Sequence, residues 1–180
     1  MRTLVLGGIR SGKSQWAETI IGESAGAGRA VRYIATGADP DGDAEWAERI
    51  AAHRSRRPSQ WSTIETVDVP TQLRSDALTA TLVDDIGGWL TAVMDRRDAW
   101  ATESPGSVTA DVDDLIDAVE SFGSPLALVS PEVGLTVVPE TVSGRRFADE
   151  LGTLNQRLAA LCERVVLMVA GQPVTVKGPS

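Results

Sequence analysis

Residues 7–14 read Gly-Gly-Ile-Arg-Ser-Gly-Lys-Ser, which matches the phosphate-binding pattern G-x-x-x-x-G-K-S. The short, largely apolar run of residues 2–6 before it predicts a strand, and residues 15–21 after it predict a helix. In such a loop the backbone N–H groups turn inward around phosphate oxygens. Lys13 would add a positive charge at the β- and γ-phosphates, and the Ser14 hydroxyl could ligate Mg²⁺. The motif therefore predicts binding of a nucleoside triphosphate.

A carboxylate partner for the metal is expected at the end of another strand. Asp84 follows the buried apolar run of residues 80–83 and could hold Mg²⁺ opposite Ser14. An aspartate that caps the next helix would give the same pattern, so that alternative stays open. Asp85 is the weaker metal candidate, because it would point to the other side of an extended chain.

The single histidine of the chain, His53, is a second candidate for chemistry. It lies in a helix expected over residues 43–54, and four arginines stand within four residues of it. A neutral imidazole is a competent nucleophile toward phosphorus, and nearby arginines would lower its pKa and keep it neutral. A lone histidine is more commonly a surface or core residue with satisfied hydrogen bonds. The residues alone leave both interpretations open.

Strand and helix patterns alternate along the chain, which is typical of an α/β protein with a mostly parallel sheet flanked by helices. We expect strands at residues 2–6, 31–35, 62–67, 80–83 and 126–129, and a C-terminal β-hairpin from residues 164–169 and 174–176. Helices are expected at residues 15–21, 43–54, 88–94, 112–122 and 144–162, and loops at 22–28, 36–42 and 96–111. One stripe of the last helix predicts a core face: Phe147, Leu151, Leu154, Leu158 and Leu161.

Composition limits the class of protein. A chain of 180 residues fits one domain, and 42% hydrophobic with 23% charged residues is ordinary for a globular protein. A net charge of -8 argues against a general nucleic-acid binder. The single cysteine, Cys162, excludes an internal disulfide and favours a reducing compartment. We expect no membrane span, no signal peptide and a cytoplasmic location.

Several separated blocks of the sequence resemble the bifunctional adenosylcobinamide kinase / adenosylcobinamide-phosphate guanylyltransferase family of cobalamin biosynthesis. The resemblance covers nearly the whole chain. Besides the phosphate loop, the blocks include Tyr-Ile-Ala-Thr at 33–36, Arg-Ile-x-x-His-Arg at 49–54, Leu-Val-Asp at 82–84, Glu-Val-Gly at 132–134 and Arg-Arg-Phe at 145–147. A phosphate loop alone is unspecific, whereas these blocks in this order are specific.

The resemblance implies a RecA-like P-loop fold, a trimer and an enzyme with two activities. The enzyme would phosphorylate adenosylcobinamide with GTP or ATP, and would then transfer GMP from GTP through a GMP–histidine intermediate on His53. The product would be adenosylcobinamide-GDP. Lys13 would be catalytic with His53, and Ser14 and Asp84 would hold Mg²⁺. The implied nucleotide contacts are Gly7, Gly8, Ile9, Arg10, Ser11, Gly12, Lys13, Ser14, Ile34, Ala35, Thr36, Arg54, Ser55, Arg56, Arg57, Glu65 and Asp84.

Departures from the family pattern occur at Asp85, Pro131 and Thr136, where cysteine, asparagine and glycine are usual. They bear on the corrinoid side, which we expect near Glu132 and Arg145, and not on the phosphate loop. Two other functions stay open: a small-molecule kinase in which His53 is structural, and a GTP-binding switch protein. A small GTPase would carry an N-K-x-D motif, which this sequence lacks.

Overall fold

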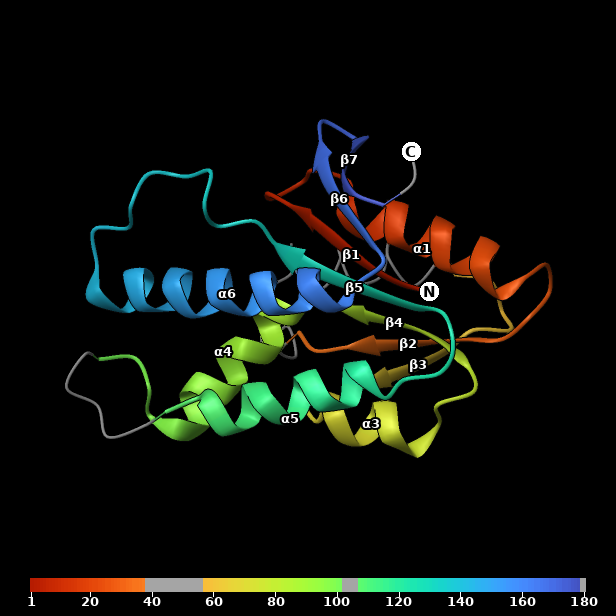
Figure 1. Cartoon of the computed structure of the whole chain (residues 1–180), viewed down its shortest axis with the longest axis horizontal. Coiled ribbons are helices and arrows are strands. Elements are labelled where there is room, and N and C mark those ends of the chain that lie inside the picture. The colour runs from red at the N-terminus through yellow and green to blue at the C-terminus, as the bar shows by residue number, and fades with distance from the viewer. Residues whose placement is uncertain (38–56, 102–106, 179–180) are drawn as a thin grey trace.

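A computed structural model describes residues 1–37, 57–101 and 107–178 of the chain. The described strands form one seven-stranded sheet with the order β3-β2-β4-β5-β1-β6-β7 (Figure 1). All neighbouring strands are parallel except β6 and β7, which form an antiparallel hairpin. The strands are β1 (Arg2–Gly7), β2 (Val31–Ala35), β3 (Ser62–Glu65), β4 (Ala80–Asp84), β5 (Leu126–Pro131), β6 (Arg164–Val169) and β7 (Gln172–Lys177). The expected parallel sheet and terminal hairpin are confirmed.

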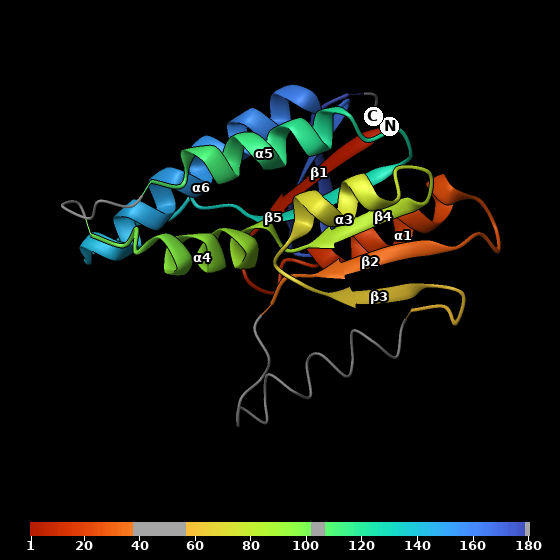
Figure 2. The ribbon, with the colours of Figure 1, turned by 90° about the horizontal axis from the view of Figure 1, so that it is seen from below.

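Helices cover both faces of this sheet. Helix α1 (Lys13–Ala25) packs on one face against β1, β2, β4 and β5. The other face carries α3 (Val69–Ser75), α4 (Ile86–Arg97), α5 (Thr109–Glu120) and α6 (Val142–Leu161). Figure 2, seen from below, shows α1 behind the strands and α3 and α5 in front of them.

Each face of the sheet has its own apolar core. On the α1 face, Ala17, Ile20 and Ile21 pack against alternate side chains of the strands. The opposite core is larger and includes Leu151, Leu154 and Leu158 of α6, all 0% exposed. Phe147 and Leu161 are partly buried beside them, so the expected core stripe is confirmed. Burial of this kind supplies most of the stability of such a fold, at about 25 cal/mol per Å² of apolar surface.

Several predicted boundaries are wrong, and local contacts explain why. Helix α1 continues through residues 22–25, which were expected in a loop, and ends where Gly26 takes a φ of 95°. Strand β3 stops two residues short of the expected end at 67, because Asp68 caps α3 by accepting a hydrogen bond from the Thr71 N–H. We did not predict α3. The expected 96–111 loop overlaps the end of α4 and the start of α5.

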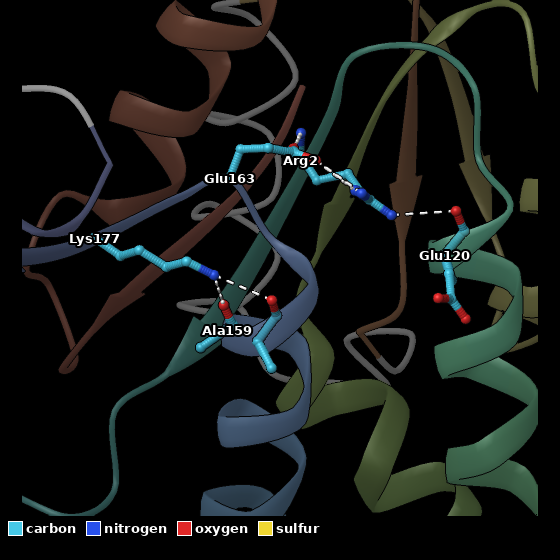
Figure 3. A network of polar contacts seen from close by, with 6 residues as sticks. Arg2, Glu120, Ala159, Glu163 and Lys177 are labelled. Atoms are coloured by element: carbon cyan, nitrogen blue, oxygen red, sulfur yellow. Dashed lines mark hydrogen bonds and ion pairs between the residues drawn. The ribbon is translucent and has the colours of Figure 1, made fainter.

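The amino ends of the strands are joined by an exposed polar network (Figure 3). The Arg2 guanidinium donates to the Glu163 carboxylate at 2.7 Å and to the Glu120 carbonyl at 3.1 Å. Lys177 donates to the carbonyls of Ala159 and Ala160 at the end of α6. These contacts connect β1, β7, α5 and α6 at the edge opposite the phosphate loop. Within the described ranges, no helix combines the length and apolar character that a membrane crossing requires.

Candidate functional site

The carboxyl ends of the parallel strands gather most of the described candidate residues along one edge of the sheet. The phosphate loop follows β1, Thr36 follows β2, Glu65 ends β3 and Asp84 ends β4. In register, Glu65 stands beside Ala35, which stands beside Asp84. Ligands of open α/β sheets bind at this edge, so the topology places these residues where a nucleotide is expected.

The shape of the phosphate loop depends on its glycines and on the C-terminal hairpin. Gly12 has a φ of 90°, and a Cβ there would lie 3.2 Å from the Gly171 Cα in the β6–β7 turn. The Gly171 N–H also donates to the Ser11 carbonyl at 3.0 Å. A Cβ at Gly7 would lie 2.4 Å from the Ser11 Oγ. The hairpin turn therefore packs against the loop. A side chain at Gly12 would be strained by the positive φ, and one at Gly7 would displace the Ser11 hydroxyl.

The loop leads into α1 in a way that suits an anion. Gly12 is the N-cap of α1 and offers no side-chain hydrogen bond, and the first turn contains no acidic residue. Backbone N–H groups at the start of a helix bind phosphate because they lack partners within the helix. The Lys13 Nζ donates to the Gly8 carbonyl at 3.4 Å, which keeps its ammonium at the mouth of the loop.

Asp84 and Asp85 have different roles. Alternation along β4 puts Asp84 on the face of Leu82, which belongs to the core beneath α1. There its Oδ2 accepts a hydrogen bond of 2.5 Å from the Tyr33 hydroxyl. Asp85 instead caps α4 by accepting from the Gly88 N–H at 2.5 Å. The alternative in which Asp84 caps the next helix is therefore wrong, because Asp85 caps α4.

The surroundings of these side chains affect their protonation. Burial raises the pKa of the Asp85 carboxyl; the Gly88 N–H and the Lys13 charge act in the opposite direction. Burial, followed by the charge of Asp84, raises the pKa of Tyr33 well above its usual range. The Tyr33 hydroxyl thus stays protonated and remains a hydrogen-bond donor at neutral pH.

Thr36 connects β2 to the turn after β4. Its hydroxyl accepts from the Asp85 N–H at 3.0 Å and donates to the Asp85 carbonyl. Its own N–H donates to the Asp84 carbonyl at 3.0 Å. Thr36 is 2% exposed, so its side chain holds the two strand ends together rather than facing solvent.

The oxygen donors at this edge suit a hard cation. A hydroxyl on Ser14 and a carboxylate on Asp84 are ligands that Mg²⁺ accepts, with water and phosphate oxygens completing its shell. Among the described residues, no cluster of three or more histidine, cysteine, aspartate or glutamate side chains could hold a metal by itself. The donor set therefore fits an ion that arrives with a nucleotide.

Comparison with known proteins identifies the family of this chain. The model of the CobU family, described as cobinamide kinase / cobinamide phosphate guanyltransferase, matches residues 3–176. The chain belongs to this family. It is 41% identical to the bifunctional adenosylcobalamin biosynthesis protein CobP of Pseudomonas aeruginosa, over 99% of the chain and 98% of that protein. It is 37% identical to CobU of Escherichia coli, over 98% and 100%. The predicted resemblance to a kinase and guanylyltransferase family is confirmed.

A solved structure supports the fold independently. The chain matches a prototypical ATPase from the type III secretion system of pathogenic bacteria with a TM-score of 0.53 and 13% identity. The match covers 92% of this chain and 50% of the ATPase chain. At this identity the likeness concerns the fold alone, and it confirms the predicted P-loop NTPase architecture.

Not every predicted contact is in a position to touch a nucleotide through its side chain. Ile34 is 0% exposed and packs into the core, so its side chain faces away from the edge. Ala35 is partly buried, and Glu65 is exposed at the end of β3. The Arg57 side chain is only 8% exposed and lies against Tyr33 and Glu18. His53, Arg54, Ser55 and Arg56 lie outside the described residues.

Two features of the site were missed by reasoning from the sequence. The Tyr33 hydroxyl contacts Asp84. From the sequence, Tyr33 was noted only as part of the Tyr-Ile-Ala-Thr block and was given no role in the site. The signal was available, since a tyrosine in a buried strand needs a hydrogen-bond partner. The contact of Gly171 with the phosphate loop joins distant parts of the chain, and no local pattern indicates it. Arg145, near which we expect the corrinoid side, donates to the carbonyls of Pro139 and Glu140.

Proposed function

We propose that this chain phosphorylates adenosylcobinamide with GTP or ATP and then transfers GMP from GTP to adenosylcobinamide phosphate, giving adenosylcobinamide-GDP. Membership of the CobU family supports both reactions. The observation that carries the proposal is that the phosphate loop and Asp84 lie at one edge of the sheet, where β2, the last described strand before His53 in the sequence, also ends. One nucleotide position would serve both reactions.

In the first reaction, the hydroxyl oxygen of the aminopropanol arm attacks the γ-phosphorus of the nucleotide. The bond from the γ-phosphorus to the β–γ bridging oxygen breaks, the nucleoside diphosphate leaves, and the hydroxyl proton passes to solvent or a base. The N–H groups at the start of α1 and the Lys13 ammonium would stabilise the negative charge that develops on the phosphate oxygens. The uncapped helix start and the place of Lys13 at the loop mouth support this role.

In the second reaction, a ring nitrogen of His53 attacks the α-phosphorus of GTP and pyrophosphate leaves. A phosphate oxygen of adenosylcobinamide phosphate then attacks the same phosphorus, the P–N bond breaks, and His53 is regenerated. Because the phosphate loop would bind the β- and γ-phosphates, pyrophosphate would be the leaving group. The family match at residues 49–54 supports His53 in this role.

Ser14 and Asp84 would hold Mg²⁺, whose charge would neutralise the β- and γ-phosphates. We also propose that residues 1–180 form one domain and that the protein works in a reducing, cytoplasmic setting, as its single cysteine suggests. By analogy with its family, we propose that it is a homotrimer.

The decisive test uses GTP labelled at the α-phosphate. We expect a covalent protein label that is lost in acid and stable in base, as a phosphoramidate is, and that is missing from His53→Ala. A label retained by His53→Ala would remove His53 from the nucleophile role. Transfer of the γ-phosphate alone, without any α-label, would support a plain small-molecule kinase. Purified adenosylcobinamide phosphate should release the label as adenosylcobinamide-GDP.

A further inference from the structure

A buried series of contacts stands behind Asp84. The Tyr33 hydroxyl donates to the Asp84 Oδ2 at 2.5 Å, and the central carbon of the Arg57 guanidinium lies 3.3 Å from the centre of the Tyr33 ring. Tyr33 is 2% exposed. In register, Tyr33 stands beside Leu82, so Asp84 is its diagonal neighbour on the same face of the sheet. The backbone pairing thus brings the hydroxyl to the carboxylate.

Arg57 is held from three sides. Its Nη1 donates to the Thr63 Oγ1 of β3 at 2.9 Å, and its Nε lies 3.9 Å from the Glu18 Oε1 of α1. The exposed fractions of the Arg57 and Glu18 side chains are 8% and 11%. A buried guanidinium loses its hydration and is kept only with several partners in place. These contacts join α1, β2, β3 and β4 around the Tyr33 ring.

We propose that Tyr33 and Arg57 are positioning residues for Asp84, and that they orient its carboxylate toward the Mg²⁺ of the bound nucleotide. Because the Tyr33 hydroxyl uses Oδ2, the remaining Oδ1 is the oxygen that can turn toward the cation. Arg57 fixes the plane of the Tyr33 ring, and so fixes the direction from which the hydroxyl donates. Partners of this kind, one step removed from the metal, orient its ligands in many proteins. The inference rests on the proposed role of Asp84.

The same contacts give Arg57 a different role from the nucleotide contact that the family motif implies. A guanidinium stacked on Tyr33 and bonded to Thr63 acts on the nucleotide only through Asp84. If it contacted the nucleotide itself, its removal would weaken binding in the absence of any metal. Positioning predicts instead that only the metal-dependent part of the affinity changes, and this difference can be measured.

The test is calorimetric titration of the full-length protein with the α,β-methylene analogue of GTP, with and without Mg²⁺. This analogue cannot release pyrophosphate, so binding is measured without turnover. In Tyr33→Phe, which keeps the ring beneath Arg57, and in Arg57→Met, which removes the guanidinium, we expect the Mg²⁺-dependent gain in affinity to fall about tenfold. Binding without Mg²⁺ should stay within about twofold. Thr81→Val is the matched control, because it removes a buried hydroxyl of β4 that bonds to the Thr79 carbonyl at 2.9 Å.

A double-mutant cycle with Asp84→Asn separates this inference from the proposed function. We expect Asp84→Asn to abolish the Mg²⁺-dependent gain, and Tyr33→Phe to add no further loss in that background. An unchanged gain in Asp84→Asn would overturn the metal role of Asp84 itself. A loss in Asp84→Asn with none in Tyr33→Phe would overturn the positioning role alone. Weaker metal-free binding in Tyr33→Phe would overturn it as well, and would indicate direct contact with the nucleotide.

Discussion

The two edges of the sheet carry polar networks built from similar groups but buried to different extents. At the amino edge, the side chains of Arg2 and Glu163 are 22% and 49% exposed (Figure 3). At the carboxyl edge, Tyr33 and Thr36 are each 2% exposed, and the Arg57 side chain is 8% exposed. Water screens the first network, whereas the second acts in a low dielectric where lost partners are costly.

The difference in burial separates contacts that affect only stability from contacts that also affect catalysis. The exposed network joins the amino ends of the strands. It should affect the stability of the fold slightly and catalysis not at all. The buried network lies next to the phosphate loop, so it should affect both. Variants at the two edges can therefore test whether the two networks act separately.

The largest expected effect is on activity at the carboxyl edge. Lys13→Ala should lower the rates of both the phosphoryl and the guanylyl transfer by at least about 100-fold, because the variant removes the charge that stabilises the transferring phosphates. Its unfolding temperature should hardly change, since the hydrogen bond from the Lys13 ammonium to the Gly8 carbonyl is long, at 3.4 Å. Steady-state assays of each half-reaction, with calorimetric melting, measure the two effects. Guanylylation at full rate would contradict the one-site model.

A smaller effect is expected for the stability of the same edge. Thr36→Val removes both hydrogen bonds between the Thr36 hydroxyl and the backbone of Asp85, and leaves a buried N–H and carbonyl beside a methyl group. We expect the free energy of unfolding to fall by about 1–3 kcal/mol. Urea titration measures the loss. Thr36→Ser keeps the hydroxyl and should recover most of the stability; a loss equal to that of Thr36→Val would show that the methyl, not the hydroxyl, matters.

Much of this architecture could be predicted from local patterns. The phosphate loop, the strands β1 to β5 and the apolar stripe of α6 can each be recognised from a few neighbouring residues. The preference for Asp84 over Asp85 as the metal candidate followed from strand alternation, and the two side chains do have different partners, Tyr33 for Asp84 and the Gly88 N–H for Asp85. Short helices are harder, because the seven residues of α3 depend on its Asp68 cap and on packing rather than on a periodic pattern.

The sequence could not predict the contacts between residues on neighbouring strands and turns. The contact from Tyr33 to Asp84 needs the register of β2 against β4, and the contact from Gly171 to Ser11 needs the return of the hairpin to the phosphate loop. Both join residues that are far apart in the chain. Loop geometry and strand order decide such contacts. A motif therefore identifies the residues expected to contact the ligand, but not the residues that position them.

The smallest effect is expected at the amino edge, and it should depend on pH. Hydrogen bonds from the Arg2 side chain lower the pKa of Glu163 from its ordinary value of 4.5 to about 2. The stabilisation is therefore complete above pH 4.5 and is lost as the pH falls toward about 2. Because Glu163 is half exposed, solvent screening should keep this contribution below about 1 kcal/mol.

Glu163→Gln tests this directly, since it keeps the shape of the side chain and removes its charge. At neutral pH the variant should be slightly less stable than the parent chain, and the gap between their urea midpoints should close as the pH approaches 2. Both activities should be unchanged. A loss of several kcal/mol, or slower phosphoryl transfer, would mean that the two edges are coupled through β1, which runs from Arg2 directly into the phosphate loop. The contrast between a solvent-screened network at the amino edge and a buried network at the carboxyl edge would then fail.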